Sequence, residues 1–451
     1  MEASKGDENG LRIALCVYRG NPFSGGQGVY TKYLTEALLD LGHAVTVFSG
    51  PPYPELDSRA ELVKIKSLDL YRQPDPFRVP KLEEFESVFD LIEFGLMSTG
   101  AFPEPRVFGY RAGRLIAGRA HEFDVIHDNQ SLNWSLLRLH LDGMPMVASI
   151  HHPITVDRRL DMKAAKGLKA KFGAFRWYGF VRHQCEVARR INSILTVSET
   201  SRRDLASSMG IDPQRVRVVP IGVDTTVFRP LPGVERVPFT VVTTASADVP
   251  LKGLVHLVEA FSLLVRAYPQ ARLSIIGATR PGSAVQRLVD RLGLRSRVEF
   301  LGKVSQEEIV SLYSVSQVAC VPSLYEGFSL PAIEAMACGI PLVATDGGAL
   351  PEVVGDDGAA ALIARAGDAA SIAEQIARVF DSPELASSLS HHARLRVLAR
   401  YSWRSAALAT VEVYRAAIKD ARGTTGKTGP PLGAVPMALD EDPTEAVGGR
   451  S

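Results

Sequence analysis

The chain has 451 residues, of which 46% are hydrophobic and 22% are charged, and its formal net charge is +1. This length and composition are typical of a globular protein whose large core is divided between two or three domains. A net charge near zero excludes a general attraction to nucleic acid and leaves only local charged patches to consider.

The chain carries few signs of export or of a metal site. No two of its cysteines have the spacing of metal ligands, and all lie among apolar neighbours: Cys16, Cys185, Cys320 and Cys338. Buried, reduced thiols are therefore expected. The N-terminal sequence MEASKGDENG lacks the regions of a secretion signal, and no run approaches the about 18 apolar residues of a membrane span. The sequence predicts a cytoplasmic protein.

The first half of the chain has the pattern of an open α/β sheet. Residues 11–18, LRIALCVY, predict a buried parallel strand, because they are apolar and are followed by turn residues. A loop and a helix ending near Gly42 lead to a second strand at 44–48. Further strands are predicted at 123–127, 146–150, 193–197 and 216–219.

The pattern begins again after residues 220–238, which are rich in proline and glycine and which we interpret as a connection between domains. Strands are predicted at 239–245, 272–277, 298–302, 318–322 and 341–345. Helices are predicted at 253–267, 283–292, 305–315, 330–338, 368–379 and 402–419. Two Rossmann-like domains, 11–225 and 226–400, are the simplest architecture.

The end of the chain, residues 421–451, is rich in glycine, proline and threonine and is predicted to be disordered. Asp440-Glu441-Asp442 matches a metal-binding D-x-D string. In an acidic, disordered tail these carboxylates are expected to be solvated, so no metal site is predicted.

The first strand is followed by Gly25, Gly26 and Gly28, directly before a helix. Glycines at this point let backbone N–H groups approach an anion, although tight turns also need glycine. A dinucleotide-binding loop would read G-x-G-x-x-G, with an acidic residue ending the second strand. That strand ends in Phe48-Ser49-Gly50, so the sequence argues against NAD binding.

The second domain contains residues suited to phosphates and hydroxyls. Lys252 lies on the first strand-to-helix connection, at the sheet edge where open α/β folds bind ligands. Glu326 lies in a loop after a strand, and Glu334 lies one turn into the following helix. The amides of residues 327–330 can face an anion, while the two carboxylates can accept hydrogen bonds from sugar hydroxyls. This combination fits a nucleotide-sugar.

The E-x7-E spacing, the later run PLVATDGGALPEVV and the two Rossmann-like domains resemble the retaining, family-4-type glycosyltransferases of the GT-B fold. The resemblance covers about residues 11–420. It implies a glycosyltransferase that moves a hexose from a nucleoside diphosphate sugar to a saccharide or lipid-linked hydroxyl. It also implies front-face displacement, retention, and no bound metal or other cofactor.

The resemblance also implies roles for individual residues. Glu326 would contact donor-sugar hydroxyls, Glu334 the ribose and Lys252 the phosphates. Helix 402–419 would cross back to the first domain. Backbone amides would hold the diphosphate at Gly327, Phe328, Ser329 and Leu330, while the loop with Gly25 and Gly26 would close over it.

Two histidines follow a strand in VASIHHPITV. His151 matches the family's histidine, which would hydrogen-bond the donor sugar. It is favoured over His152, because successive residues of a strand point to opposite sides. His127 and Ser198 also lie at strand ends, but for these two packing is the favoured interpretation.

The sequence departs from the family pattern before Lys252. A Gly-Arg pair is usual there, and this chain has Ser246 and Ala247, so one phosphate-neutralising charge is missing. Arg280, which follows another strand of the same sheet, is a hypothetical substitute. The usual N-G-V-D also reads IGVD at 221–224.

A basic, aromatic segment at 158–182 holds eight lysines and arginines among five aromatic residues. It predicts either peripheral contact with an anionic membrane or a helix whose aromatics belong to the core. Apolar residues at helical spacing between 82 and 96 favour packing.

Two other functions stay open: a nucleotide-sugar epimerase, or a protein that binds the nucleotide-sugar without turning it over.

Overall fold

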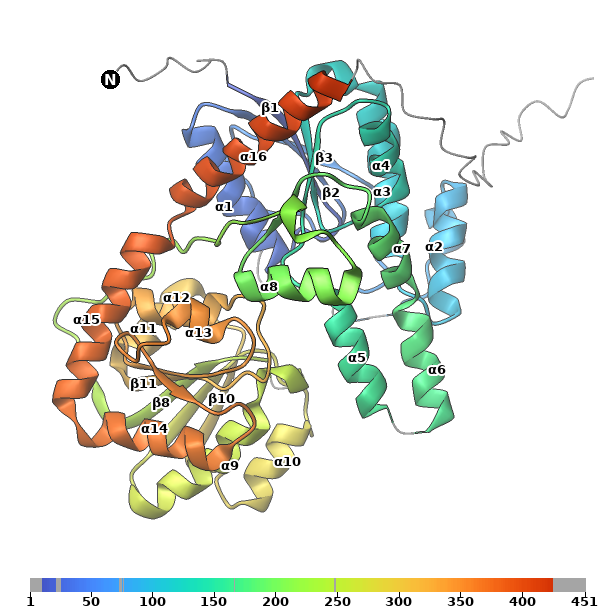
Figure 1. Cartoon of the computed structure of the whole chain (residues 1–451). Coiled ribbons are helices and arrows are strands. Elements are labelled where there is room, and N and C mark those ends of the chain that lie inside the picture. The colour runs from blue at the N-terminus through green and yellow to red at the C-terminus, as the bar shows by residue number, and fades with distance from the viewer. Residues whose placement is uncertain are drawn as a thin grey trace, which may run out of the picture.

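A computed structural model describes residues 10–21, 26–72, 75, 77–165, 167–246 and 249–424. Gly25, most of the predicted disordered tail and its D-x-D string lie outside these residues. The described residues form two parallel α/β sheets, each with helices packed on it (Figure 1).

The first sheet has the order β3-β2-β1-β4-β5-β6-β7. Its strands are β1 (Arg12–Val17), β2 (Ala44–Ser49), β3 (Glu61–Lys64), β4 (Val125–Asn129), β5 (Met146–Ser149), β6 (Ile194–Thr196) and β7 (Val216–Val218). The α-helices of this half are α1 (Gln27–Asp40), α2 (Val88–Ser98), α3 (Glu104–Gly118), α4 (Trp134–Leu141), α5 (Ile154–Ala164), α6 (Leu168–Trp177), α7 (Gly179–Ala188) and α8 (Glu199–Asp204). The central strand β1 is buried over most of its length, as its apolar sequence predicts.

The second sheet has the order β10-β9-β8-β11-β12-β13. Its strands are β8 (Val237–Thr244), β9 (Arg272–Ile276), β10 (Val298–Gly302), β11 (Ser316–Val321), β12 (Leu342–Thr345) and β13 (Leu362–Ala364). Its α-helices are α9 (Leu254–Ala267), α10 (Ala284–Arg291), α11 (Gln306–Val315), α12 (Leu330–Ala337), α13 (Leu350–Val354), α14 (Ala369–Asp381) and α15 (Pro383–Arg400), and α16 (Trp403–Thr424) ends the described chain.

The sequence patterns locate most strands of both sheets, and β3, β13 and α15 are among the elements that they miss. The edge strand β3 is half-exposed and begins and ends with charged residues. Strand β13 has only three residues. Helix α15 buries only Leu389, Ala393 and Val397 out of 18 residues, so its apolar periodicity is weak.

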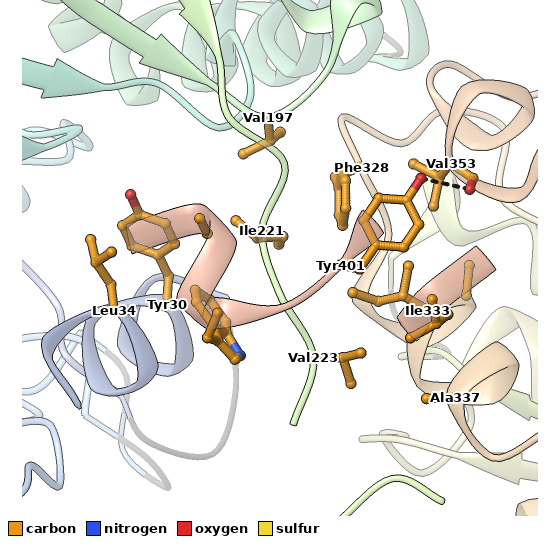
Figure 2. Packing of buried hydrophobic residues seen from close by; sticks show 14 of the residues in the cluster. Tyr30, Leu34, Val197, Ile221, Val223, Phe328, Ile333, Ala337, Val353 and Tyr401 are labelled. Atoms are coloured by element: carbon orange, nitrogen blue, oxygen red, sulfur yellow. Dashed lines mark hydrogen bonds between the residues drawn. The ribbon is translucent and has the colours of Figure 1, made fainter. Parts of the chain in front are cut away.

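The first half of the connection at 220–238 is packed, whereas most residues from 229 to 238 are exposed. Val223 and Phe228 are buried in a core that also takes residues from both domains, and β8 begins already at Val237. Figure 2 shows Ile221 and Val223 between Tyr30 on one side and Ile333 on the other. This stretch has no periodicity because an irregular backbone presents its apolar side chains to the core.

Helix α16 lies against the first domain, beside α1, β4 and β5, whereas α15 packs on α12 of the second domain (Figure 1). It runs to Thr424, five residues beyond the predicted end. Its Tyr414 hydroxyl lies 2.6 Å from Nδ1 of His127 on β4. The chain therefore passes from the second domain back to the core of the first.

The apolar residues spaced between 82 and 96 do not form one packed helix. The backbone changes direction at Phe85, and Leu82 is 91% exposed. The buried positions of α2 are Asp90, Glu93 and Met97. The two carboxylates can be buried because Arg111 pairs with both of them. Among the residues the structure describes, no helix combines the length and apolar character of a membrane span.

Candidate active site

The candidate site lies where the strand order of each sheet reverses. In the second sheet β8 and β11 are neighbours, and in the first sheet β1 and β4 are neighbours. Connections from these strands leave the sheet in opposite directions, which opens a crevice at the carboxyl ends of the strands. Lys252 follows β8, Glu326 follows β11, and His151 comes shortly after β5.

Lys252 and Glu326 form an ion pair at this edge. The Lys252 ammonium lies 2.7 Å from Oε1 of Glu326, and the Ser323 hydroxyl donates to the same oxygen at 2.7 Å. The lysine side chain is 32% exposed and the glutamate 11% exposed. The lysine side chain is therefore partly accessible to solvent, while one carboxylate oxygen of Glu326 is held in place.

The pair depends on a close approach of two loops. The Leu324 amide donates to the Leu251 carbonyl at 2.8 Å. Gly253 has a φ of 65°, and a Cβ there would lie 1.9 Å from the carbonyl oxygen of Pro322. Only glycine fits this position, which also begins α9.

Residues 327–330 form the entry to α12. The first amides of a helix have no acceptor within it, and the helix dipole favours an anion at that end. Ser329, which caps α12, has a φ of 105°. A positive φ in a residue other than glycine costs about 1–3 kcal/mol, and such residues cluster at functional sites. Phe328 is buried against Tyr401, with ring centroids 5.6 Å apart, which anchors the chain two residues before Leu330, the first residue of α12.

Glu334 lies one turn into α12, as the sequence predicts. Its side chain is only partly exposed, and burial raises its pKa to about 7. The carboxylate therefore changes its charge near neutral pH. A ligand hydroxyl would be held best by the ionised form, which accepts stronger hydrogen bonds.

His151 is held by the first domain. Its Nε2 lies 2.8 Å from Oδ1 of Asn129, and its ring packs edge-on against Tyr30 with centroids 4.4 Å apart. The Asn129 amide nitrogen donates to Thr31 at 3.3 Å, so Oδ1 is an acceptor and Nε2 of His151 carries the proton. Burial lowers the pKa of His151 to about 4. The imidazole is neutral, with Nδ1 as an acceptor.

His152 and His127 have other neighbours. His152 lies 2.9 Å from Asp157, and its ring lies 5.2 Å from that of Tyr325 in the second domain. His127 is fully buried, and its second nitrogen lies 2.7 Å from the hydroxyl of Ser149. Burial lowers the pKa of His127 to about 3. His152 therefore lies at the domain boundary, whereas both nitrogens of His127 are engaged inside the first domain.

Three other predicted features lie on connections that follow strands, with Gly26 after β1, Arg280 after β9 and Gly347-Gly348 after β12. Gly26 directly precedes α1, and Gly25 lies outside the described residues. Arg280 is exposed on the loop after β9, the neighbour of β8, and Ser246 reaches across to that loop with a hydrogen bond of 3.2 Å to the Ala278 carbonyl. After Gly347-Gly348, the Ala349 amide donates to the Glu326 carbonyl at 2.8 Å.

Several residues that support this centre are not among those predicted from the sequence. Asn129, the last residue of β4, binds the His151 ring, and Gln130, which follows β4, accepts the hydrogen bond of the His151 amide at 3.1 Å. Glu352 binds the first turn of α8. A polar pair directly after an apolar strand was a usable signal for Asn129 and Gln130. Within the described ranges, no group of three histidine, cysteine, aspartate or glutamate side chains could hold a metal ion.

The basic segment is partly core and partly surface. Tyr178 and Phe180 are buried, and Trp177 packs on Phe102. By contrast, Phe172 and Phe175 on α6 are 65% and 54% exposed. Neither predicted alternative for this segment describes all of it.

Known proteins share this architecture. Residues 24–227 match Glycosyltransferase Family 4, and residues 236–396 match Glycosyl transferases group 1. The sucrose-phosphate synthase of Thermosynechococcus elongatus superposes with a TM-score of 0.67 at 23% identity, over 91% of this chain and 100% of that one. An Anabaena protein solved with UDP and glucose superposes with a TM-score of 0.65 at 17% identity, over 90% and 99%. These likenesses define the GT-B fold.

Sequence relatives give the family. The MMP alpha-(1->4)-mannosyltransferase of Mycolicibacterium hassiacum is 46% identical over 409 residues, which are 90% of this chain and 98% of that protein. The D-inositol 3-phosphate glycosyltransferase of Kineococcus radiotolerans is 30% identical over 70% of this chain and 78% of its own length. The chain belongs to glycosyltransferase family 4 and is a glycosyltransferase.

The raised pKa of Glu334 predicts a pH dependence. If this carboxylate binds donor hydroxyls, kcat/KM for the donor falls as the pH drops through about 7, because protonation removes the ionised acceptor. Glu334→Gln should lower kcat/KM about tenfold or more at pH 8 and flatten this part of the profile. Initial rates between pH 5.5 and 8.5 measure both effects.

Glu299→Gln is a suitable control, because Glu299 is exposed on β10, away from the cleft edge. A profile of Glu334→Gln that keeps the wild-type fall near pH 7 would assign that titration to another group.

Proposed function

We propose that the chain transfers a mannosyl residue from a nucleoside diphosphate mannose to a saccharide hydroxyl, forming an α-(1→4) bond. The observation that carries this proposal is the Lys252–Glu326 pair beside the start of α12. The mannosyl group and the linkage come from the name of the 46% identical relative.

The reaction proposed for this site needs charge stabilisation at the leaving group. The diphosphate accepts hydrogen bonds from the amides of residues 327–330 and is attracted by Lys252. Glu326 accepts hydrogen bonds from sugar hydroxyls with its second carboxylate oxygen, and Nδ1 of neutral His151 accepts another. Glu334 binds the ribose. The acceptor hydroxyl attacks the anomeric carbon from the face that the diphosphate leaves and gives its proton to the departing phosphate oxygen. The anomeric configuration is therefore retained, and no metal is required.

A panel of nucleoside diphosphate sugars tests this proposal. Purified protein is incubated with GDP-, UDP- and ADP-linked mannose and glucose and with α-(1→4)-linked mannose oligosaccharides. We expect transfer from one mannose donor, unchanged by EDTA, with an α-anomeric product signal in the proton NMR spectrum.

The same panel separates the rival functions. An epimerase would interconvert donor sugars without an acceptor, and a binding protein would bind a donor without turning it over. A β-anomeric product would overturn retention, and loss of transfer in EDTA would overturn metal independence.

Arg280 is proposed to supply the phosphate charge that is missing before Lys252. Its support is its position on the loop adjacent to Ser246. Arg280→Ala should raise the donor KM about tenfold, since a charge-assisted hydrogen bond contributes about 1.5–3 kcal/mol. Arg295→Ala is the control, because Arg295 is an exposed arginine just before β10, at the opposite edge of the sheet. Unchanged kinetics of Arg280→Ala would rule out the compensation.

Peripheral contact of α6 with an anionic membrane is a further part of the proposal. Leu168, Phe172 and Phe175 are 89%, 65% and 54% exposed. Their spacing of four and three residues puts them on one helix face, opposite Trp177, which packs on Phe102. The exposed Lys169 and Lys171 add positive charge on both sides. A basic helix with an exposed apolar face suits a surface of anionic lipid.

Sedimentation with vesicles tests this contact. The protein should pellet with vesicles that contain phosphatidylglycerol and stay in solution with phosphatidylcholine alone. The double variant Phe172→Ser, Phe175→Ser should lose the binding. The matched control replaces Leu395 and Leu398, a similarly exposed pair on α15. Absence of binding to anionic vesicles, or equal loss in the control, would remove this proposal.

A further inference from the structure

Helix α8 of the first domain is bound to the donor loop of the second domain. The Ser198 hydroxyl donates to the Gly327 carbonyl at 2.7 Å, and the Ser201 hydroxyl donates to the same oxygen at 3.1 Å. Both serines are fully buried. A Cβ on Gly327 would lie 2.8 Å from the His151 carbonyl, so the two domains meet here at backbone contact distance.

A second contact comes from Glu352 on α13. Its Oε1 accepts from the Glu199 amide at 2.8 Å, and its Oε2 accepts from the Thr200 amide at 3.2 Å. The carboxylate of one domain thus caps a helix of the other, at the end where the helix dipole favours negative charge. Figure 1 shows α8 on the side of the first domain that faces α13.

A third contact lies at the other end of α8. The Tyr325 hydroxyl donates to Asp204 at 2.5 Å. Tyr325 directly precedes Glu326, so the donor loop is bound to α8 on both sides of Glu326. Glu352 is also held within its own domain, because the Arg396 side chain donates to the Glu352 backbone carbonyl at 2.8 Å.

We propose that Ser198, Ser201 and Glu352 are positioning residues that hold the two domains together and fix the peptide group of Gly327. We call the hydrogen bonds of these three side chains across the domain boundary the clasp. The Gly327 carbonyl and the Phe328 amide belong to the same peptide group. Because the two serines hold this carbonyl, they also fix the direction of the Phe328 N–H, which is one of the amides proposed to bind the donor diphosphate. The clasp forms only in the closed cleft, so donor binding and closure favour each other. This inference rests on the proposed donor site.

Variants of the clasp should weaken donor binding without matching losses of stability. Ser201→Ala removes one hydrogen bond between the domains, and we expect the donor KM to rise about threefold. Glu352→Gln leaves one acceptor oxygen for two amides, and we expect a rise of about tenfold. In both variants kcat falls as well, because the Gly327 peptide is less firmly held.

Ser283→Ala and solution scattering are the controls. Ser283 caps α10 by accepting from the Gln286 amide at 3.2 Å, as Ser198 caps α8, but its hydrogen bonds in the described structure stay within the second domain. It should lower the melting temperature about as much as Ser198→Ala while leaving the donor KM unchanged. By small-angle scattering, Ser201→Ala/Glu352→Gln without donor should have a larger radius of gyration than the wild type.

Donor KM values within twofold of wild type in Ser201→Ala and Glu352→Gln would overturn the clasp. So would an equal rise in Ser283→Ala, or an unchanged radius of gyration. If the wild type transfers no sugar from any donor, the proposed function fails, and scattering alone then decides whether the clasp exists.

Discussion

The ion pair between Lys252 and Glu326 is the contact on which the site depends. It joins loops that leave two neighbouring strands, β8 and β11, although the two residues are 74 positions apart in the sequence. The loops can meet because Gly253 has no side chain, and a Cβ at this position would clash with the Pro322 carbonyl. Once the second loop is held, the start of α12 is held with it. Glu334 then lies one turn further on the same helix.

The electrostatics of the cleft follow from burial. Burial raises the pKa of Glu334 and lowers that of His151, so both groups are driven toward their neutral forms. In the proposed function, the ammonium of Lys252 and the helix start are then the main attraction for the donor diphosphate. Because Glu326 already holds the ammonium in place, little reorganisation is needed when charge develops on the leaving group.

The domains are joined by more than a flexible connection. The apolar core formed by Val223, Phe328 and Tyr401 continues from one domain into the other (Figure 2). Helix α16 ties the end of the described chain to β4 through Tyr414 and His127. In contrast to this apolar core, the contacts of α8 with the second domain are polar and lie beside the donor loop. Polar contacts of this kind can break and re-form at a smaller cost than an apolar core.

Much of the fold and the centre of the site could be predicted from the sequence. Buried parallel strands are continuous apolar runs, so β1, β5 and β12 are easily recognised, and the carboxyl ends of the predicted strands that correspond to β8 and β11 locate Lys252 and Glu326. The half-exposed β3 and the weakly periodic α15 could not be found in this way.

Contacts across the domain boundary could not be predicted either. That Glu352 caps α8 follows from how the two sheets are placed together. Local periodicity contains no such information. Apolar spacing also fails to predict that Asp90 and Glu93 of α2 are buried, because their partner Arg111 lies on another helix.

A crystal structure with a bound nucleoside diphosphate is the most direct test of the donor site. We expect the terminal phosphate to lie within hydrogen-bond distance of the Lys252 ammonium and of at least one amide among residues 327–330, with the ribose hydroxyls on Glu334. A diphosphate bound elsewhere, or a ribose that makes no contact with Glu334, would contradict this expectation.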